Sequence, residues 1–264
     1  MLEVLDLHKT FHLDDNPLND KKALQGVNLT VKEGDFITVI GSNGSGKTTL
    51  LNLIAGTFLP DEGKIILNDK DITKLKVYQR AKYIGRVFQD PRVGTIADIS
   101  LFENLSIASR RGKPQSPLRY ALTKEMEREF KKVLSPLGLG LEDRLSAPMG
   151  TFSGGQRQSV TLLMATMAEP ELLLLDEHTA ALDPGTAKTV MELTDRIVNE
   201  SKIPTIMITH NMKDAIKYGN RLIMMDNGKI VYSCEGQEKR NLKPKDLIDR
   251  FSSTGEIRDS DFLS

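Results

Sequence analysis

Residues 41–49 read Gly-Ser-Asn-Gly-Ser-Gly-Lys-Thr-Thr, and they match the pattern G-x-x-x-x-G-K-[ST]. In loops of this pattern, the glycines let successive backbone N–H groups point inward and hold phosphate oxygens. The lysine reaches the β- and γ-phosphates, and the hydroxyl that follows it binds Mg²⁺. We therefore predict that Lys47 contacts phosphate and that Thr48 takes a Mg²⁺ position. Because the pattern is short, its flanks must decide between a phosphate site and a glycine-rich turn in some α/β domain.

The flanks of the loop favour the phosphate site. Residues 36–40 form an apolar, β-branched run that is typical of a buried strand. After the loop, Leu50, Leu51 and Ile54 fall at helical spacing, and Gly56 supplies a stop signal. A strand, a glycine loop and a helix in this order place an anion at a helix N-terminus, where backbone donors and the helix dipole both favour phosphate. The sequence therefore predicts a nucleoside triphosphate site.

Composition limits the other possibilities. The 264 residues fit one large domain, or one domain that carries a subdomain. Lysine plus arginine number 36 and aspartate plus glutamate also number 36, so the basic character of a nucleic-acid binder is missing. The single cysteine, Cys234, suits a reducing cytosol. Since no apolar run approaches the ~20 residues of a membrane span and no signal-peptide pattern is present, we expect an intracellular protein that meets membranes through a partner.

Short strands separated by turn residues occupy much of the chain. We predict strands at residues 2–7, 23–31, 64–67, 83–88 and 203–208, and a hairpin in which an Asn-Gly turn joins residues 221–225 to 230–232. Residues 12–22 are polar and indicate a loop, and residues 235–264 indicate a short helix and a tail. Two strand-end residues allow two interpretations. Phe11 is an apolar strand end or a surface for a nucleobase, and Gln89 is a turn former or a ligand near the phosphates.

Residues 96–150 change character and lie between strands of the nucleotide domain. Ser116 can cap a helix that has Pro117 at its first position. A stripe of apolar side chains follows and ends before Pro136 and Gly138. Its members recur every four residues, at Leu118, Leu122, Met126, Phe130 and Leu134. We interpret this segment as an inserted helical subdomain, with the stripe as its core.

A second glycine-containing stretch, Ser153-Gly154-Gly155-Gln156, precedes a helical run at residues 159–167. In isolation, Ser-Gly-Gly favours a plain loop. Before a helix, however, the serine and the glycine N–H groups lie at a helix N-terminus, where phosphate is favoured. The stretch is therefore a second potential phosphate-binding edge.

Two acidic residues follow an unbroken run of four leucines, residues 172–175. The run predicts a central parallel strand, and ligands bind beyond the carboxyl ends of such strands. We predict that Asp176 binds Mg²⁺, directly or through water, and that Glu177 orients and deprotonates an attacking water. His210 follows the strand at residues 203–208 and is a candidate contact for the γ-phosphate, although a lone histidine is more often structural.

Together, these motifs resemble the ATP-binding subunit of an ABC transporter, and the resemblance covers nearly the whole chain. Residues 41–48 are similar to the Walker A loop, and the run that ends in Asp176 and Glu177 is similar to the Walker B strand with its catalytic glutamate. Gln89 matches the Q-loop, residues 152–156 the family signature, residues 180–183 the D-loop and His210 the switch histidine. Three departures remove no phosphate contact and no catalytic group: Phe152 replaces leucine, His178 replaces proline and Ala180 replaces serine.

The resemblance implies a fold. It is an α/β fold: a P-loop NTPase (RecA-like) core with an antiparallel β subdomain and an inserted α-helical subdomain. We expect the first part of the core in residues 1–95 and its second part in residues 159–234. The helical subdomain, which ends in the signature, is then residues 96–158, and a tail follows in residues 235–264.

The resemblance also implies an Mg²⁺-dependent ATPase, with ATP and Mg²⁺ as cofactors. Glu177 and His210 are then catalytic, and the metal is held at Thr48, Gln89 and Asp176. Phe11 lies where the family places its adenine-stacking aromatic residue. The resemblance therefore favours Phe11 as a surface for the nucleobase over Phe11 as an apolar strand end. The expected nucleotide contacts are Phe11, Ser42, Asn43, Gly44, Ser45, Gly46, Lys47, Thr48, Thr49, Gln89, Ser153, Gly154, Gly155 and Gln156.

Members of this family pair head to tail, and each ATP lies between the Walker A loop of one copy and the signature of the other. The resemblance therefore implies a second copy of the chain and integral membrane permease subunits as partners, no nucleic acid, and a place on the inner face of the cell membrane. A stand-alone ATPase chain is most typical of prokaryotic importers, which implies an extracytoplasmic solute-binding protein as well. Residues 149–151 and 176–183 resemble a subgroup linked to aromatic amino acids.

The alternative is a soluble ABC ATPase of DNA repair or translation. Repair members insert long coiled coils between the Q-loop and the signature, whereas here 153 − 89 = 64 positions separate Gln89 from Ser153, without sustained heptads. Translation members usually carry two cassettes and a basic character, whereas this chain has one cassette and zero net charge. Length and charge therefore favour the transporter.

Overall fold

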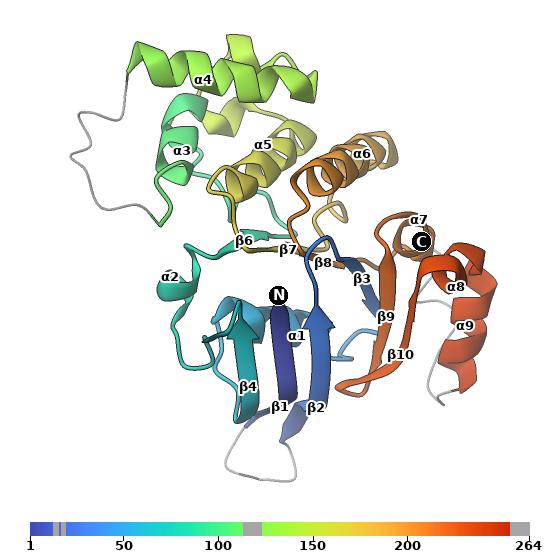
Figure 1. Cartoon of the computed structure of the whole chain (residues 1–264). Coiled ribbons are helices and arrows are strands. Elements are labelled where there is room, and N and C mark those ends of the chain that lie inside the picture. The colour runs from blue at the N-terminus through green and yellow to red at the C-terminus, as the bar shows by residue number, and fades with distance from the viewer. Residues whose placement is uncertain (13–15, 17–19, 113–122, 254–264) are drawn as a thin grey trace.

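The computed structural model describes residues 1–12, 16, 20–112 and 123–253. Two sheets face each other across one helix, α1 (Lys47–Ala55), as Figure 1 shows. One sheet has six strands in the order β10-β9-β3-β8-β7-β6, and the other has four strands in the order β2-β1-β4-β5. The predicted α/β class, with an antiparallel β subdomain beside a parallel P-loop sheet, is confirmed.

The six-stranded sheet is parallel except for its last strand. Its strands are β3 (Phe36–Gly41), β6 (Ile84–Val87), β7 (Leu172–Asp176), β8 (Thr205–Ile208), β9 (Arg221–Asp226) and β10 (Lys229–Glu235), and only β10 is antiparallel to its neighbour. Every residue of β3, β7 and β8 is buried. Because helices cover both faces of this sheet, its strands are continuous apolar runs. The carboxyl ends of β3, β7 and β8 therefore meet at one edge.

The four-stranded sheet is antiparallel and consists of β1 (Leu2–Phe11), β2 (Lys21–Val31), β4 (Glu62–Leu67) and β5 (Lys70–Asp71). Strand β1 is longer than the predicted 2–7, because it continues to Phe11, which pairs with Lys21. Apolar side chains of β1, β2 and β4 form one core with α1 and the parallel sheet. Among its members from α1, Leu50, Leu51, Leu53 and Ile54 are fully buried.

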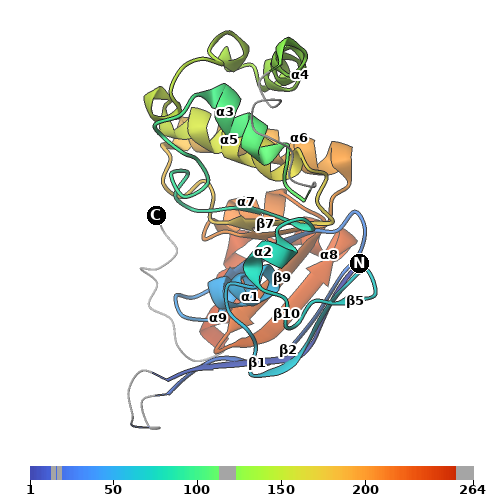
Figure 2. The same cartoon turned by 90° about the vertical axis from the view of Figure 1, so that its left-hand side faces the viewer.

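Helices gather on the other face of the parallel sheet: α3 (Leu101–Ala108), α4 (Lys124–Leu134), α5 (Gly154–Thr166) and α6 (Pro184–Ser201). Figure 2 shows them together, away from the antiparallel sheet. Between α4 and α5 lie three short 3-10 helices, Ser135–Leu137, Leu141–Asp143 and Met149–Thr151. Helices α3, α4 and α5 share an apolar cluster of their own. The division of the chain at residues 95, 158 and 234 stays a prediction, and α5 runs through the second of these positions.

The helix predicted from Ser116 differs from the structure. Its predicted start and its first stripe residues, Ser116, Pro117, Leu118 and Leu122, lie outside the described residues. Helix α4 begins only at Lys124, because Thr123 has an extended backbone and its hydroxyl accepts the Met126 N–H at 3.2 Å. The prediction of one continuous helix through residue 123 is therefore wrong. A threonine that caps a helix competes with helical backbone bonding at its own position. Downstream, Phe130 and Leu134 are buried as the stripe predicts.

Beyond β10, the described residues form two helices, α8 (Gly236–Asn241) and α9 (Pro244–Ser253), where one was predicted. They lie beside α7 (Met212–Lys217) in Figure 1. The buried Lys239 ammonium joins α8 to the end of α7, because it donates to the carbonyls of Ile216, Tyr218 and Gly219 at 3.0, 2.5 and 3.0 Å. These carbonyls end α7 and have few helical partners. Burial lowers the pKa of Lys239 to about 8.

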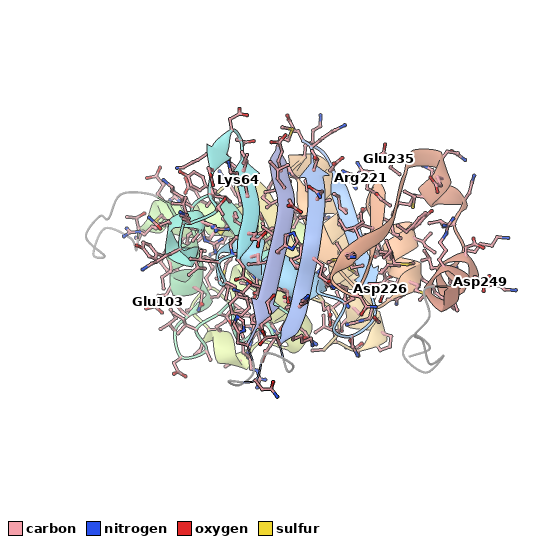
Figure 3. The ribbon with its side chains drawn as sticks, turned by 90° about the horizontal axis from the view of Figure 1, so that it is seen from below. Lys64, Glu103, Arg221, Asp226, Glu235 and Asp249 are labelled. Atoms are coloured by element: carbon pink, nitrogen blue, oxygen red, sulfur yellow. The ribbon has the colours of Figure 1, made fainter. Side chains whose placement is uncertain are left out.

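The hairpin β9–β10 closes the parallel sheet, as its Asn-Gly turn predicts. Figure 3 shows Arg221 and Glu235 together at one end of this hairpin and Asp226 at the other. Arg221 also bonds Asp35 at 2.8 Å, so the hairpin is tied to the start of β3. The remaining described helix, α2 (Val77–Arg80), is short. None of the helices in the described ranges is long and apolar enough to span a bilayer.

Candidate functional site

The glycine loop lies between β3 and α1, at the carboxyl edge of the parallel sheet. Lys47 is only 4 % exposed, and its ammonium donates to the carbonyls of Gly41 at 2.7 Å and Ser42 at 2.9 Å. Burial lowers its pKa, and the negative charges of Glu177 and Asp176 act in the opposite direction. The lysine is therefore folded over the loop, with two carboxylates near its charge.

Two other elements hold the loop in place. At Gly46, where φ is +101°, a Cβ atom would lie 2.5 Å from the Ala23 carbonyl oxygen, so β2 passes directly over the loop. The turn between β9 and β10 supports it from another side, because the Gly228 N–H donates to the Ser45 carbonyl at 3.1 Å. The sequence indicated a turn at residues 226–229, but nothing in it predicted this contact with the loop.

The loop shares a pocket of about 190 Å³ with residues that are distant in the sequence. Its lining residues are Phe11, Lys21, Ala23, Asn43, Gly44, Gly46, Lys47, Thr48, Thr49 and Glu177. The Phe11 ring packs edge-on against Phe58, with ring centroids 5.3 Å apart. The structure thus brings Phe11 and Glu177 to the glycine loop, as an adenine contact and a catalytic base require. Both roles stay predictions.

Asp176 ends β7 and is 8 % exposed. Burial raises the pKa of its carboxyl, and the charge of Arg86 opposes this rise. Arg86 reaches across from β6, donates to Asp176 at 3.2 Å and also bonds the Thr57 hydroxyl at 3.2 Å. Sequence reasoning missed Arg86. The available signal was its place on the predicted strand before Gln89, which becomes informative only when β6 is known to pair with β7.

Glu177 and His210 form a hydrogen-bonded pair, with His210 Nε2 and Glu177 Oε1 2.6 Å apart. The two residues follow neighbouring strands, β7 and β8, and the Glu177 N–H bonds the Ile208 carbonyl at 3.1 Å. The hydrogen bond from His210 lowers the pKa of Glu177, while burial raises it. The predicted base and the predicted γ-phosphate contact are therefore in direct contact with each other.

The next residue, His178, is completely buried, and this burial lowers its pKa to about 4. Its Nε2 atom lies 3.0 Å from the Thr194 hydroxyl, and that hydroxyl donates its own proton to the Val190 carbonyl at 2.8 Å. His178 is therefore neutral and donates from Nε2. This bond ties the residue after Glu177 to the middle of α6. The family resemblance marked His178 only as a departure, without a role.

The signature residues lie elsewhere. Ser153 caps α5: its hydroxyl accepts the Gln156 N–H at 3.3 Å, and the Gln156 side chain accepts the Ser153 N–H at 3.1 Å. Gly154 and Gln89 line a second pocket of about 410 Å³, together with Asp90, Pro91, Arg92, Arg157, Ala181 and Leu182. No residue lines both pockets. Within one chain, the structure therefore brings Gln89 to the signature side and not to the pocket of the glycine loop.

ATP and Mg²⁺ fit the donors of the loop. The Ser45 hydroxyl is buried and has no hydrogen-bond partner within the described structure, although it lies in the middle of the loop. Lys47 supplies a cation and the loop supplies backbone N–H groups, which suits a polyphosphate. Mg²⁺ is usually held by one or two protein oxygens together with phosphate and water. The exposed Thr48 hydroxyl and the Asp176 carboxylate are oxygens of the required kind.

A glycine loop that joins a buried parallel strand to a helix, with acids at the tip of another strand of the same parallel sheet, defines a P-loop nucleoside triphosphatase. The family model described as ABC transporter matches residues 24–180, and the chain belongs to this family. The chain is the ATPase subunit of an ABC transporter.

Two curated relatives match almost the whole chain. The tyrosine transport ATP-binding protein of Clostridioides difficile (strain R20291) is 41% identical over 252 residues, covering 95% of this chain and 98% of the relative. The L-cystine import ATP-binding protein of Bacillus subtilis (strain 168) is 34% identical over 258 residues, covering 95% of this chain and 92% of the relative.

Solved structures agree with the fold. An ATP-binding cassette in its ADP conformation has a TM-score of 0.76 at 30% identity, covering 97% of this chain and 99% of that chain. A dimeric ATP-binding cassette in a post-hydrolysis state, bound to ADP and Pi, has a TM-score of 0.73 at 28% identity, covering 89% of this chain and 98% of that chain. The family that the motifs indicated is confirmed.

Proposed function

We propose that this chain hydrolyses ATP with Glu177 as the general base, in a site that a second copy of the chain completes. The observation that carries the proposal is the hydrogen-bonded pair of Glu177 and His210, with 2.6 Å between their atoms, in which Glu177 also lines the pocket of the glycine loop. A carboxylate whose pKa is lowered by such a pair remains ionised and can accept a proton.

The proposed reaction uses residues of this one edge of the sheet. Lys47 and the loop N–H groups hold the β- and γ-phosphates, and Phe11 stacks on the adenine. Glu177 takes a proton from a water molecule while the water oxygen bonds to the γ-phosphorus and the bond to the ADP oxygen breaks. His210 holds Glu177 in position and contacts the γ-phosphate. Mg²⁺, held by Thr48 and Asp176, would neutralise charge on the phosphates.

The second copy supplies the opposite wall of the site. Ser153 and Gly154 lie at a helix N-terminus, which favours phosphate, yet Gly154 lines a different pocket from Lys47. Two chains arranged head to tail would place the signature of each against the glycine loop of the other. The dimeric cassette bound to ADP and Pi supports this arrangement, because it matches 89% of this chain. Gln89 would then act beside the shared site, as a metal or water ligand.

The proposed process is the import of an amino acid. Relatives named for tyrosine transport and for the import of L-cystine and methionine support this substrate class. The chain would work on the inner face of the cell membrane with integral membrane permease subunits and an extracytoplasmic solute-binding protein. Transport relatives and zero net charge favour this role over DNA repair or translation, and no nucleic acid takes part.

Phosphate release with Glu177→Gln tests the proposed base. The change keeps the size of the side chain and a hydrogen bond to His210 but removes the basic carboxylate. We expect ATP binding to persist and turnover to fall by roughly 10²–10⁴-fold. The control is Glu200→Gln, which makes the same change on the exposed part of α6. Turnover near that of the unchanged chain in Glu177→Gln would show that Glu177 is not the base.

A further inference from the structure

Lys21 is the first residue of β2, and it lies directly opposite Phe11 in the antiparallel pairing with β1. Residues that face each other across two antiparallel strands point to the same side of the sheet. Lys21 and Phe11 accordingly line the same pocket, together with Gly44 and Lys47 of the glycine loop. A lysine therefore lies beside the aromatic ring that would hold the base.

The path of β2 over the loop brings Lys21 close to the phosphate-binding backbone. The Ala23 backbone lies over Gly46, and two residues earlier in the strand, the Lys21 ammonium is 3.6 Å from the position that a Cβ atom would take on Gly44. Side chains alternate along a strand, so Lys22 points to the opposite face. Lys22 does not line the pocket.

The charge of Lys21 is available to a ligand. The neighbouring basic side chains are engaged: Lys9 bonds Asp61 at 2.7 Å, and His12 Nδ1 lies 2.8 Å from Asp20. In the described part of the chain, the exposed Lys21 has no ion-pair partner. Lys47, by contrast, already donates to two loop carbonyls and lies near two carboxylates.

We propose that Lys21 is a second cationic phosphate contact of the nucleotide site. A nucleotide whose base stacks on Phe11 and whose terminal phosphates lie on the loop must pass the Lys21 ammonium. The ammonium therefore binds the α- and β-phosphates, and it strengthens the binding of ADP as well as ATP. This inference rests on the proposed function, because it takes the positions of the base and the phosphates from it.

Titration calorimetry of Lys21→Met and Lys22→Met with ATP and ADP tests the contact. Methionine keeps the length of the stem and removes the charge, and Lys22→Met makes the same change on the other face of the strand. We expect Lys21→Met to bind both nucleotides about three- to tenfold more weakly, with Lys22→Met unchanged. The difference should shrink in high salt, because an exposed ion pair is screened. Lys21→Arg should restore most of the affinity.

Each failure has a different meaning. If the unchanged chain binds neither nucleotide, the proposed function is wrong. If it binds both and the two methionine variants have equal affinities, Lys21 makes no phosphate contact. A loss for ATP alone would overturn the assignment to the α- and β-phosphates, and a loss that persists in high salt would overturn the electrostatic role. Circular dichroism that matches the unchanged chain excludes misfolding, and KM should rise while kcat stays within about twofold.

Discussion

At the scale of single residues, His210 favours the ionised form of Glu177. The hydrogen bond from His210 lowers the pKa of Glu177, and burial alone would raise it. A carboxyl whose folded pKa lies below its unfolded value stabilises the folded protein above the unfolded pKa, and it loses this contribution as pH falls through the folded pKa. The same interaction keeps the base ionised at lower pH.

The lowered pKa of Glu177 predicts how the ATPase reaction depends on pH. His210→Ala removes the donor while the burial of Glu177 remains, so the acid limb of the normalised kcat/KM profile should move to higher pH. His210→Gln keeps a neutral donor and should move it less. Labelled ATP allows the slow variants to be measured. If protonation of His210 itself sets the acid limb, its removal should move the limb to lower pH, which would contradict the account.

The site residues differ in how well the sequence predicts them. Lys47, Asp176 and Glu177 are locatable because each has a fixed place in a short motif. The contact of Arg86 with Asp176 spans 90 positions and depends on the pairing of β6 with β7. No local pattern contains that information.

At the scale of elements, the glycine loop depends on two parts of the chain that share no motif with it. Strand β2 covers it at Gly46, and the β9–β10 turn bonds it at Ser45. Gly228 serves both contacts, because a Cβ atom there would lie 2.8 Å from the Ala23 carbonyl oxygen. The turn therefore fixes the position of β2 as well as the shape of the loop.

Gly228→Ala and Gly34→Ala test this support. Both residues have a left-handed backbone, with φ of +73° and +75°, so each alanine costs about 1–2 kcal/mol of strain. Only Gly228 has a close neighbour, whereas nothing lies within 4 Å of Gly34. We expect Gly228→Ala to unfold at lower urea concentration than Gly34→Ala and to bind ADP more weakly. Equal affinities for ADP in the two variants would show that the turn does not support the loop.

Element types were well predicted, and element limits less so. The apolar run at residues 172–175 and the Asn-Gly turn predict β7 and the β9–β10 hairpin, because buried parallel strands and tight turns have strong local signatures. The stripe from Leu118 to Leu134 crosses Thr123, where the chain is extended. Thr123 caps α4 there, and the spacing of apolar residues alone does not reveal a helix cap. The second C-terminal helix, α9, depends on packing of Leu247 against distant strands.

At the scale of the whole molecule, the glycine loop and the start of α5 lie at two separate pockets of one chain. Lys47 and Glu177 line one pocket, and Gly154 lines another. The family membership and the dimeric cassettes among the similar structures agree with a site shared between two chains. The central claim of the proposed function is this sharing.

Mixing two inactive variants tests the claim most directly. Lys47→Ala removes the cation of the loop, and Ser153→Arg places a bulky cation at the start of α5, so each chain should release no phosphate alone. In a heterodimer, the loop of the Ser153→Arg chain meets the signature of the Lys47→Ala chain, and one intact site forms. The account predicts phosphate release from the mixture above that of either variant. No release from a mixture that cross-linking shows to contain heterodimers would contradict it.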